Sequence, residues 1–119
     1  MLGSILPINF LTNLKKTAAS KRAVIPRLSD YSKTFFKDWE NLSRSGRYDM
    51  NVLKEVMLLL VANDGPLRAE WKDHELKGDW QGYRECHVGG DFLLIYKLSP
   101  GKPDTIVFIR TGTHSELFK

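Results

Sequence analysis

Three short apolar segments in the last third of the chain constrain the fold most strongly. They cover residues 82–88, 91–96 and 106–114, and β-branched, leucine and aromatic side chains dominate them. Gly89 and Gly90 separate the first two segments, and a Pro- and Gly-containing run over residues 99–104 separates the last two. Glycine supplies the positive φ of a tight hairpin at little cost. The pattern therefore predicts a three-stranded antiparallel meander.

Two amphipathic stretches precede these segments and predict helices. Apolar side chains recur at helical spacing over residues 31–42, after a candidate cap at Ser29-Asp30 and before Ser45-Gly46. Asp49 is the candidate cap of a second helix over residues 50–61, whose apolar side is wide. A helix with such a wide apolar side is expected to pack flat on a sheet.

The order of the predicted elements indicates the fold class. A short strand over residues 23–28 comes first, the two helices follow, a loop covers residues 67–81, and the meander ends the chain. Helices and strands that segregate in this way are typical of the α+β class. We expect two N-terminal helices on one face of a mainly antiparallel, twisted sheet of about four strands. The other face is then available for a site.

The first 22 residues differ from the rest of the chain. Apolar side chains come before Lys15-Lys16 there, whereas a signal peptide carries its positive charge ahead of its apolar stretch. We expect this segment to lie outside the domain, as a tag, residues from an upstream start, an extra helix or a partner-binding segment. Residues 23–119 are then one domain, a length that is sufficient for a hydrophobic core.

Charge and cysteine content exclude several classes of protein. The formal net charge is +4, but residues 1–29 alone contribute +5 and residues 66–119 sum to zero. Bulk charge is therefore weak evidence for nucleic-acid binding. The single cysteine, Cys86, excludes an internal disulfide and favours a buried thiol in a reducing compartment. No apolar run reaches the roughly 20 residues that span a bilayer.

The histidines are the strongest functional signal, because imidazole exchanges protons near neutral pH. If residues 88–90 form the hairpin loop, His87 and Asp91 face each other across its mouth, at about 5 Å between Cβ atoms. A carboxylate at that distance orients an imidazole for proton transfer. The alternative is a polar hairpin end without a role.

Strand alternation places a second pair of polar residues together. Arg110 and His114 share one side of the last segment if that strand is regular. A guanidinium binds phosphate through its planar fork, and the histidine can transfer a proton. The alternative is a solvated strand end. A metal site built from His74, His87, Asp91 and His114 is a weaker possibility, because their spacing fits no metal motif.

Four stretches, read in order, resemble one known family. They are Lys72-Asp-His74; Leu76-Lys-Gly78-x-Trp80-x-Gly82-Tyr83-Arg84-x-x-His87-Val88; Asp91-x-x-Leu94-Ile95-Tyr96-Lys97-Leu98; and Arg110-Thr-Gly-Thr-His114-x-x-Leu117-Phe118. Their combination is similar to the YafQ branch of the RelE/ParE superfamily of bacterial toxins. The resemblance covers residues 23–119. Phe92 stands where that family often has Trp.

The resemblance implies a function and a set of residues. Members of this family are ribosome-dependent mRNA endoribonucleases of the bacterial cytoplasm, which a cognate antitoxin neutralises. The implied partners are mRNA in the ribosomal A site, the ribosome and the antitoxin, with no cofactor, no metal and no membrane. The implied catalytic residues are His74, His87, Asp91, His114 and Phe118, and the implied RNA- or phosphate-binding residues are Arg84 and Arg110.

These residue types suit cleavage of RNA at its own 2′-hydroxyl. A base takes the hydroxyl proton, an acid protonates the leaving 5′-oxygen, and a cation stabilises charge on the phosphate. Which histidine acts as base does not follow from the sequence. Two alternatives remain: a toxin of the same superfamily that binds a protein such as gyrase without cutting RNA, and an unrelated small RNA-binding domain.

Overall fold

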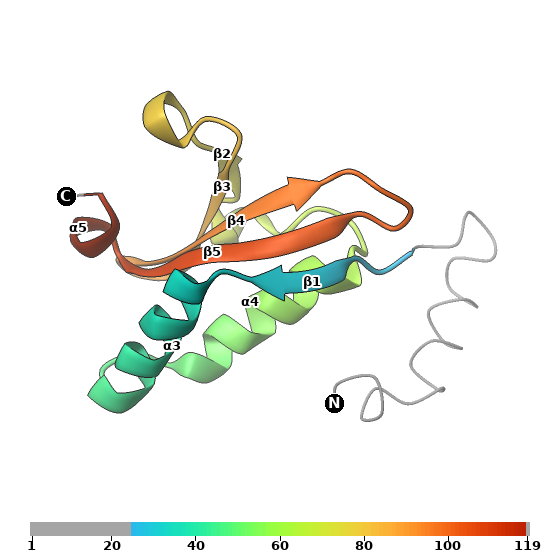
Figure 1. Cartoon of the computed structure of the whole chain (residues 1–119). Coiled ribbons are helices and arrows are strands. Elements are labelled where there is room, and N and C mark those ends of the chain that lie inside the picture. The colour runs from blue at the N-terminus through green and yellow to red at the C-terminus, as the bar shows by residue number, and fades with distance from the viewer. Residues whose placement is uncertain (1–24, 119) are drawn as a thin grey trace.

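A computed structural model describes residues 25–118, which form a five-stranded sheet covered by helices on one face (Figure 1). The sheet order is β1-β5-β4-β3-β2. The strands are β1 (Leu28–Tyr31), β2 (His74–Glu75), β3 (Arg84–Gly89), β4 (Phe92–Ser99) and β5 (Thr105–Thr113). The helices are α3 (Lys33–Ser45), α4 (Met50–Ala62) and the short α5 (His114–Leu117). The predicted α+β class and the predicted meander are confirmed.

The meander forms because its strands are apolar on both sides. Strand β4 pairs antiparallel with β3 and with β5, and its residues 92–96 are all buried. β1 adds to the far side of β5 in the parallel direction, and β2 adds to β3 in the antiparallel direction. The sheet has five strands where about four are predicted, because the two-residue β2 lies inside the segment expected to be a loop.

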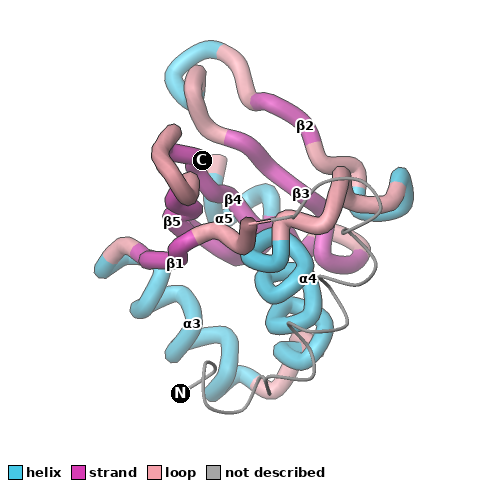
Figure 2. Tube along the Cα trace, turned by 90° about the vertical axis from the view of Figure 1, so that its right-hand side faces the viewer, coloured by secondary structure: helices cyan, strands magenta, loops and turns pink. Residues whose placement is uncertain are grey.

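The N-terminal strand and the first helix begin later than the sequence predicts. The strand expected at residues 23–28 is β1 at Leu28–Tyr31, and the cap of α3 is Ser32, not Ser29 or Asp30. The Ser32 hydroxyl accepts the Phe35 N–H at 2.9 Å and donates to the Ile109 carbonyl at 2.8 Å. This double contact fixes the point at which the chain leaves β1 and turns into α3 (Figures 1 and 2).

The other helix ends agree with the prediction. Gly46 caps the C-terminal end of helix α3, and its φ of 67° is free of strain only for a residue without a Cβ. Asp49 caps α4 by accepting the Asn51 N–H at 3.0 Å, and Asn63 ends α4 in the left-handed region. The residues expected to form an N-terminal extension, 1–22, lie outside the described part of the chain. None of the helices within residues 25–118 has the length and apolar content needed to cross a bilayer.

The buried side chains divide into two clusters, one on each face of the sheet. The larger cluster lies between the sheet and the helices α3 and α4, and it contains Phe35, Leu53, Val56, Cys86, Leu94, Tyr96 and Phe108 among others. The smaller cluster contains Leu93, Ile95 and Leu117, with Trp80, Tyr83 and Phe118 packed against it. Strand alternation explains the division, because neighbours in β4 project to opposite faces. We call the two faces the helix face and the open face.

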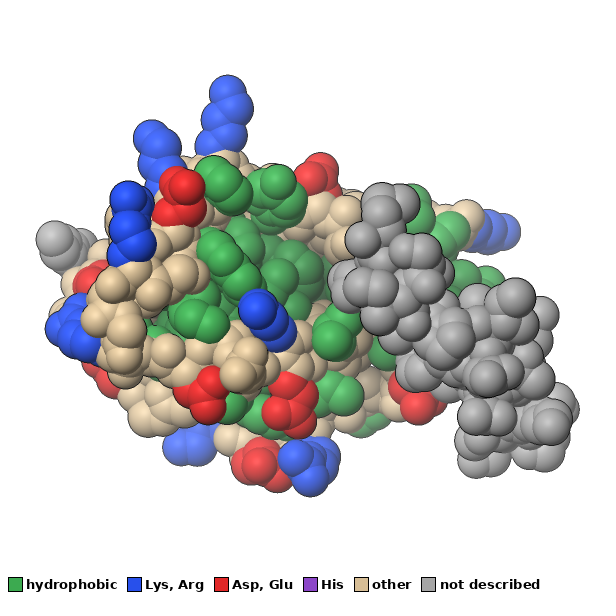
Figure 3. Space-filling model, turned by 90° about the horizontal axis from the view of Figure 1, so that it is seen from below, with side chains coloured by type: hydrophobic (Ala, Val, Ile, Leu, Met, Phe, Trp, Pro, Cys, Tyr) green, Lys and Arg blue, Asp and Glu red, His purple; other side chains and the backbone are tan. Residues whose placement is uncertain are grey.

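Figure 3 views the molecule from below Figure 1, the side on which α3 and α4 lie, and apolar side chains gather on it. The exposed large apolar residues of these two helices are Phe36, Leu58 and Leu59, which are 47%, 41% and 41% accessible. Tyr31, 57% exposed, stacks on Phe36 with ring centroids 6.1 Å apart. We call these four residues the helix-side patch.

Candidate active site

The open face of the sheet carries the acid–base groups. His87 is paired with Leu93, and Leu93 is paired with Gly112, so these three residues lie side by side across β3, β4 and β5. His114 follows two residues after Gly112 as the first residue of α5. Because two strand spacings separate β3 from β5, the backbones that carry His87 and His114 are about 10 Å apart.

Glu85 joins two of the histidines. It lies two residues before His87 on β3, so both side chains project to the open face. Its Oε2 is 3.3 Å from Nε2 of His74 and 3.6 Å from Nε2 of His87. The two imidazole rings are 6.2 Å apart between centroids. The carboxylate is almost fully buried, and its Oε1 has no hydrogen-bond partner among residues 25–118.

The contacts of His74 indicate where its protons are. Nδ1 lies 2.7 Å from the Lys72 carbonyl, which can only accept, so Nδ1 carries a proton. Nε2 faces the Glu85 carboxylate, which also only accepts when it is ionised. The arrangement is therefore most favourable when both nitrogens are protonated. With both nitrogens protonated, His74 could donate a proton or stabilise negative charge.

Asp91 does not face His87, and the predicted pair is wrong. Gly89 is paired with Phe92, which leaves Gly90 and Asp91 as the hairpin loop, and a bulge lies between His87 and Gly89. The bulge shifts the register, so that His87 is opposite Leu93 instead. Asp91 Oδ1 accepts the backbone N–H of His114 at 3.3 Å. The carboxylate therefore holds the start of α5.

A capping box orients α5 and the two site residues it carries. The Thr113 hydroxyl accepts the Glu116 N–H at 3.3 Å, and the Glu116 carboxylate accepts the Thr113 N–H at 2.8 Å. Gly112 permits the close approach of this turn, because a Cβ there would lie 3.0 Å from Glu116 Oε1. The box therefore fixes the last turn of the described chain, up to Phe118. The sequence pattern that indicates this capping box is the spacing Thr113-x-x-Glu116.

Aromatic rings continue the site on the open face. The rings of His114 and Phe118 are 4.9 Å apart, and Trp80 meets Phe118 edge-on at 5.7 Å. Tyr83 meets Trp80 edge-on at 5.4 Å, with the Lys97 ammonium 5.6 Å from the Tyr83 ring. The His114 imidazole has no hydrogen bond within residues 25–118, and the side chain is exposed. It is accessible to a substrate, beside a ring on which a base could stack.

Arg84 projects to the helix face and is engaged by neighbours there. Its Nη2 is 3.3 Å from Asp73 and its Nη1 is 3.6 Å from Glu75, while Nε donates to the Tyr96 hydroxyl at 3.2 Å. Burial lowers the pKa of Arg84, but the hydrogen bonds with Tyr96 and Asp73 raise it more. The role of Arg84 in RNA binding stays a prediction.

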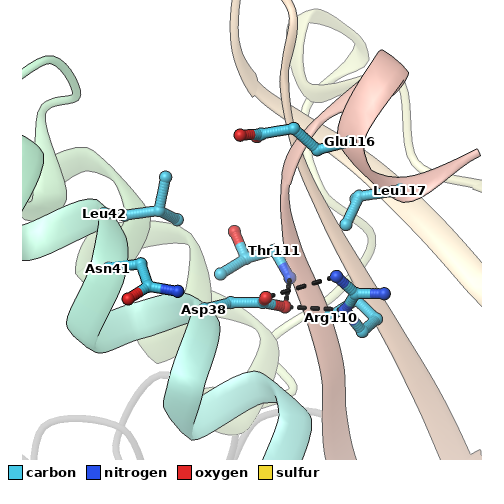
Figure 4. Close-up of a pocket in the computed structure, with 7 residues that line it drawn as sticks. All are labelled: Asp38, Asn41, Leu42, Arg110, Thr111, Glu116 and Leu117. Atoms are coloured by element: carbon cyan, nitrogen blue, oxygen red, sulfur yellow. Dashed lines mark hydrogen bonds and ion pairs between the residues drawn. The ribbon is translucent and has the colours of Figure 1, made fainter.

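Arg110 is held by helix α3, which contradicts the predicted alignment with His114. Its Nε and Nη2 donate to Asp38 at 2.8 and 3.3 Å, and the same carboxylate accepts the Thr111 N–H at 3.1 Å (Figure 4). A register shift at Ile95/Tyr96 breaks the alternation in β5, and His114 belongs to α5 instead of the strand. Residues of α3, β5 and α5 line a pocket of about 270 Å³ here: Asp38, Asn41, Leu42, Arg110, Thr111, Glu116 and Leu117.

Cys86 is a buried structural thiol, as the sequence predicts. It is fully inaccessible in the helix-face cluster. Burial raises the pKa of the Cys86 thiol strongly, and the carboxylate of Asp73 raises it further. Such a thiol is a poor nucleophile.

Metal binding gains no support from the geometry. Within residues 25–118, no three His, Cys, Asp or Glu side chains are arranged so that they could hold a metal ion. The weaker sequence possibility, a site shared by His74, His87, Asp91 and His114, is therefore not formed in this structure, since Asp91 binds the backbone of His114.

Sequence reasoning missed three acidic residues that organise the site: Glu85, Asp73 and Asp38. Glu85 could have been predicted from the sequence, because it lies two residues before His87 on a predicted strand and must lie on the same face of the sheet as His87. The contacts of Asp73 and Asp38 could not be predicted in this way, because their partners Arg84 and Arg110 are 11 and 72 residues away in sequence.

A five-stranded sheet with α3 and α4 on one face and histidines on the other defines a small α+β domain with a candidate acid–base site. The sequence pattern described as "Bacterial toxin of type II toxin-antitoxin system, YafQ" matches residues 27–119. The chain therefore belongs to the YafQ family of bacterial toxins.

Individual relatives agree with this assignment. The mRNA interferase toxin YafQ of Escherichia coli K12 is 46% identical over 95 residues, which are 80% of this chain and 99% of that protein. In the crystal structure of the E. coli DinJ–YafQ toxin–antitoxin complex, the matching chain is 46% identical with a TM-score of 0.70, over 80% of this chain and 100% of that chain. A metal-bound toxin from Helicobacter pylori is 38% identical with a TM-score of 0.66, over 79% and 100% of the two chains.

Proposed function

We propose that this protein is a ribosome-dependent endoribonuclease toxin that cleaves translated mRNA by attack of the 2′-hydroxyl on the adjacent phosphate, without a metal ion. The E. coli relative is an mRNA interferase at 46% identity over nearly its whole length. The observation that carries the proposal is the open face. It presents His74, His87 and His114 on one surface, supported by two carboxylates.

The spacing of these groups suits a general acid and a general base on either side of a phosphate. One group is the pair of histidines at Glu85, and the other is His114 at the start of α5, about two strand spacings away. In-line displacement needs proton transfer at the attacking 2′-oxygen and at the leaving 5′-oxygen, which lie on opposite sides of the phosphorus. A substrate phosphate between the two groups can meet both requirements.

We assign the roles from the contacts. His114 exchanges a proton with the substrate beside the scissile phosphate, because its ring is exposed and makes no hydrogen bond within the described chain. His74, held between the Lys72 carbonyl and the Glu85 carboxylate, stabilises the developing negative charge or donates a proton. His87 makes the remaining proton transfer. Phe118 stacks on a base next to the cleaved bond.

RNA binding relies on few placed cations. Residues 66–119, which hold the site, have no net charge, so the ribosome holds the mRNA and the toxin contributes local contacts. Arg84 and Arg110 are the arginines that the family resemblance implicates. Each forms an ion pair with a carboxylate, Asp73 and Asp38 respectively, so an RNA phosphate would have to compete with that pair or share the guanidinium.

The protein partner in this proposal is a cognate antitoxin, as DinJ is for the E. coli YafQ in their complex. The helix-side patch supports a protein partner, because apolar side chains gather on this side of the domain and exposed apolar patches often mark an interface. We place the protein in the bacterial cytoplasm, where translated mRNA is found.

Primer extension on a translated mRNA tests the proposal most directly. Wild-type protein should produce discrete new 5′ ends in the presence of ribosomes, and His114→Ala should produce none. A message carrying a 2′-deoxy nucleotide at the cleaved position should be inert, and cutting of that message would refute 2′-hydroxyl attack. Cleavage should persist in EDTA; its loss, with restoration by added metal, would refute the metal-free mechanism.

The same experiment separates the alternative toxin that acts by protein binding. Growth arrest with intact mRNA and altered DNA supercoiling would support a gyrase-type action and exclude the nuclease. No contact in the described chain favours that alternative, since a binder has no need of histidines coupled through a buried carboxylate.

A further inference from the structure

His74 is carried by the shortest strand of the sheet. Strand β2 has two residues and lies at the sheet edge, where it pairs with β3 alone. Lys72, two residues before His74, is in the left-handed region at φ 49°. Backbone pairing over so short an edge provides little local stability. The position of the His74 ring therefore depends on side-chain contacts of its neighbours.

Those contacts are made on the opposite face of the sheet. Asp73 and Glu75, the residues on either side of His74, project away from the open face by strand alternation. Arg84 contacts both of them, with Nη2 3.3 Å from Asp73 Oδ2 and Nη1 3.6 Å from Glu75 Oε1. The Arg84 guanidinium therefore contacts both sequence neighbours of His74.

Tyr96 anchors this arrangement to the central strand. Its hydroxyl donates a short hydrogen bond to Asp73 Oδ1 and accepts one from Arg84 Nε at 3.2 Å. The ring is almost fully buried in the helix-face cluster, opposite Arg84 in the β3–β4 register. Burial, and then the hydrogen bond to Asp73, raise the pKa of Tyr96. The hydroxyl therefore stays protonated and keeps donating.

We propose that Tyr96, Arg84 and Asp73 form a positioning clamp on the helix face that holds His74 against Glu85 and His87 on the open face. Arg84 then acts through His74 as a positioning residue and not as an RNA ligand. Its catalytic consequence rests on the proposed nuclease function, whereas the structural link between Tyr96 and His74 does not.

Tyr96→Phe tests the clamp because it removes only the hydroxyl. The variant should cleave ribosome-bound mRNA at least about tenfold more slowly at saturation, since a small displacement of a catalytic group has an effect of this size or more. The half-saturating ribosome concentration should stay unchanged. Tyr48→Phe is the matched control: Tyr48 packs on Phe92 in the same cluster, and its hydroxyl has no hydrogen bond within residues 25–118.

The two roles of Arg84 predict different kinetics. A clamp predicts that Arg84→Gln and Tyr96→Phe lower the saturated rate alike, and that the double variant is no worse than either single one. A phosphate ligand predicts that Arg84→Gln raises the half-saturating concentration, with a weaker salt dependence, while Tyr96→Phe behaves as wild type. The second result would overturn the proposal.

NMR of the histidine rings tests the clamp without any cleavage assay. In Tyr96→Phe the His74 ring signals should move and the β2 amides should exchange faster, while the His114 signals stay in place. Unchanged His74 signals would overturn the proposal. If Tyr96→Phe does not fold, Asp73→Asn replaces it with the same expectations. If the wild type cuts no mRNA, the proposed nuclease function fails, and the NMR result still decides the clamp.

Discussion

Glu85→Gln separates catalytic orientation from stability. The substitution keeps the side-chain shape and removes the one negative charge that lies within 3.3 and 3.6 Å of the nitrogens of His74 and His87. The amide can still accept a hydrogen bond, but it carries no charge with which to hold and orient the two rings. We expect the saturated cleavage rate to fall about 100-fold, the lower end of what an acid–base group contributes. That factor corresponds to about 2.7 kcal/mol of activation free energy.

Stability should change much less than activity. Two unit charges 3.3 Å apart interact by about 5 kcal/mol at an effective dielectric constant of 20, but burying a carboxylate costs several kcal/mol. Water further weakens the pair, because the His74 side chain is 49% exposed. Oε1 is buried without a partner in residues 25–118, so the wild-type carboxylate is incompletely satisfied. The unfolding free energy should therefore move by only about 1 kcal/mol, or about 4–8 °C in Tm.

The assay pairs single-turnover cleavage of ribosome-bound mRNA with thermal unfolding of the same preparation. Glu70→Gln is the control, because Glu70 is an exposed carboxylate in a surface pair with Arg68 at 3.2 Å and such pairs contribute little. A Glu85→Gln variant that cleaves within twofold of wild type would refute the orienting role. A variant that loses more than about 3 kcal/mol of stability would show that Glu85 is mainly structural.

Three further predictions concern stability and reactivity. Asp38→Ala should lower the unfolding free energy, measured in thermal melts, by about 2–3 kcal/mol. The reason is that it leaves the half-buried Arg110 without its carboxylate and the Thr111 N–H without an acceptor. A decrease below about 0.5 kcal/mol would contradict this prediction. Cys86 should resist a thiol reagent at pH 8 in the folded protein and react at the unfolding rate, and fast labelling would show that the thiol is reachable. The pKa values of Tyr96 and Cys86 are both raised on folding, so the folded state binds more protons than the unfolded state above about pH 8.5. The unfolding free energy, measured by denaturant titration, should therefore fall as the pH rises from there. In Tyr96→Phe this fall should be shallower above about pH 10.

Local signals in the sequence predicted the elements well. Alternation and glycine placement indicated the β3–β4–β5 meander, and Asp49 capped the helix that it was expected to cap. These features depend on neighbouring residues, which the sequence displays directly. The boundary at Ser32 was missed because its cap is selected by a long-range bond to Ile109, 77 residues away. Propensity alone favoured the equally suitable Ser29 or Asp30.

The candidate site was harder to predict because bulges decide which side chains meet. A one-residue shift reverses the face of a side chain. The hairpin loop at Gly90-Asp91, instead of residues 88–90, separated Asp91 from His87, and the shift at Ile95/Tyr96 ended the predicted alignment of Arg110 with His114. The histidines themselves were found from residue type and family resemblance. Their true carboxylate partner, Glu85, needed only the two-residue period of the strand.

Both arginines are already paired with carboxylates, and this bears on the chemistry. Arg84 is bound by Asp73 and Glu75 on the helix face, and Arg110 is bound by Asp38 of α3. A guanidinium that already neutralises a carboxylate has less to offer a phosphate that gains charge in the transition state. A protonated histidine at Glu85 would then supply positive charge on the open face. We infer that it stabilises the developing charge together with cations of the ribosome.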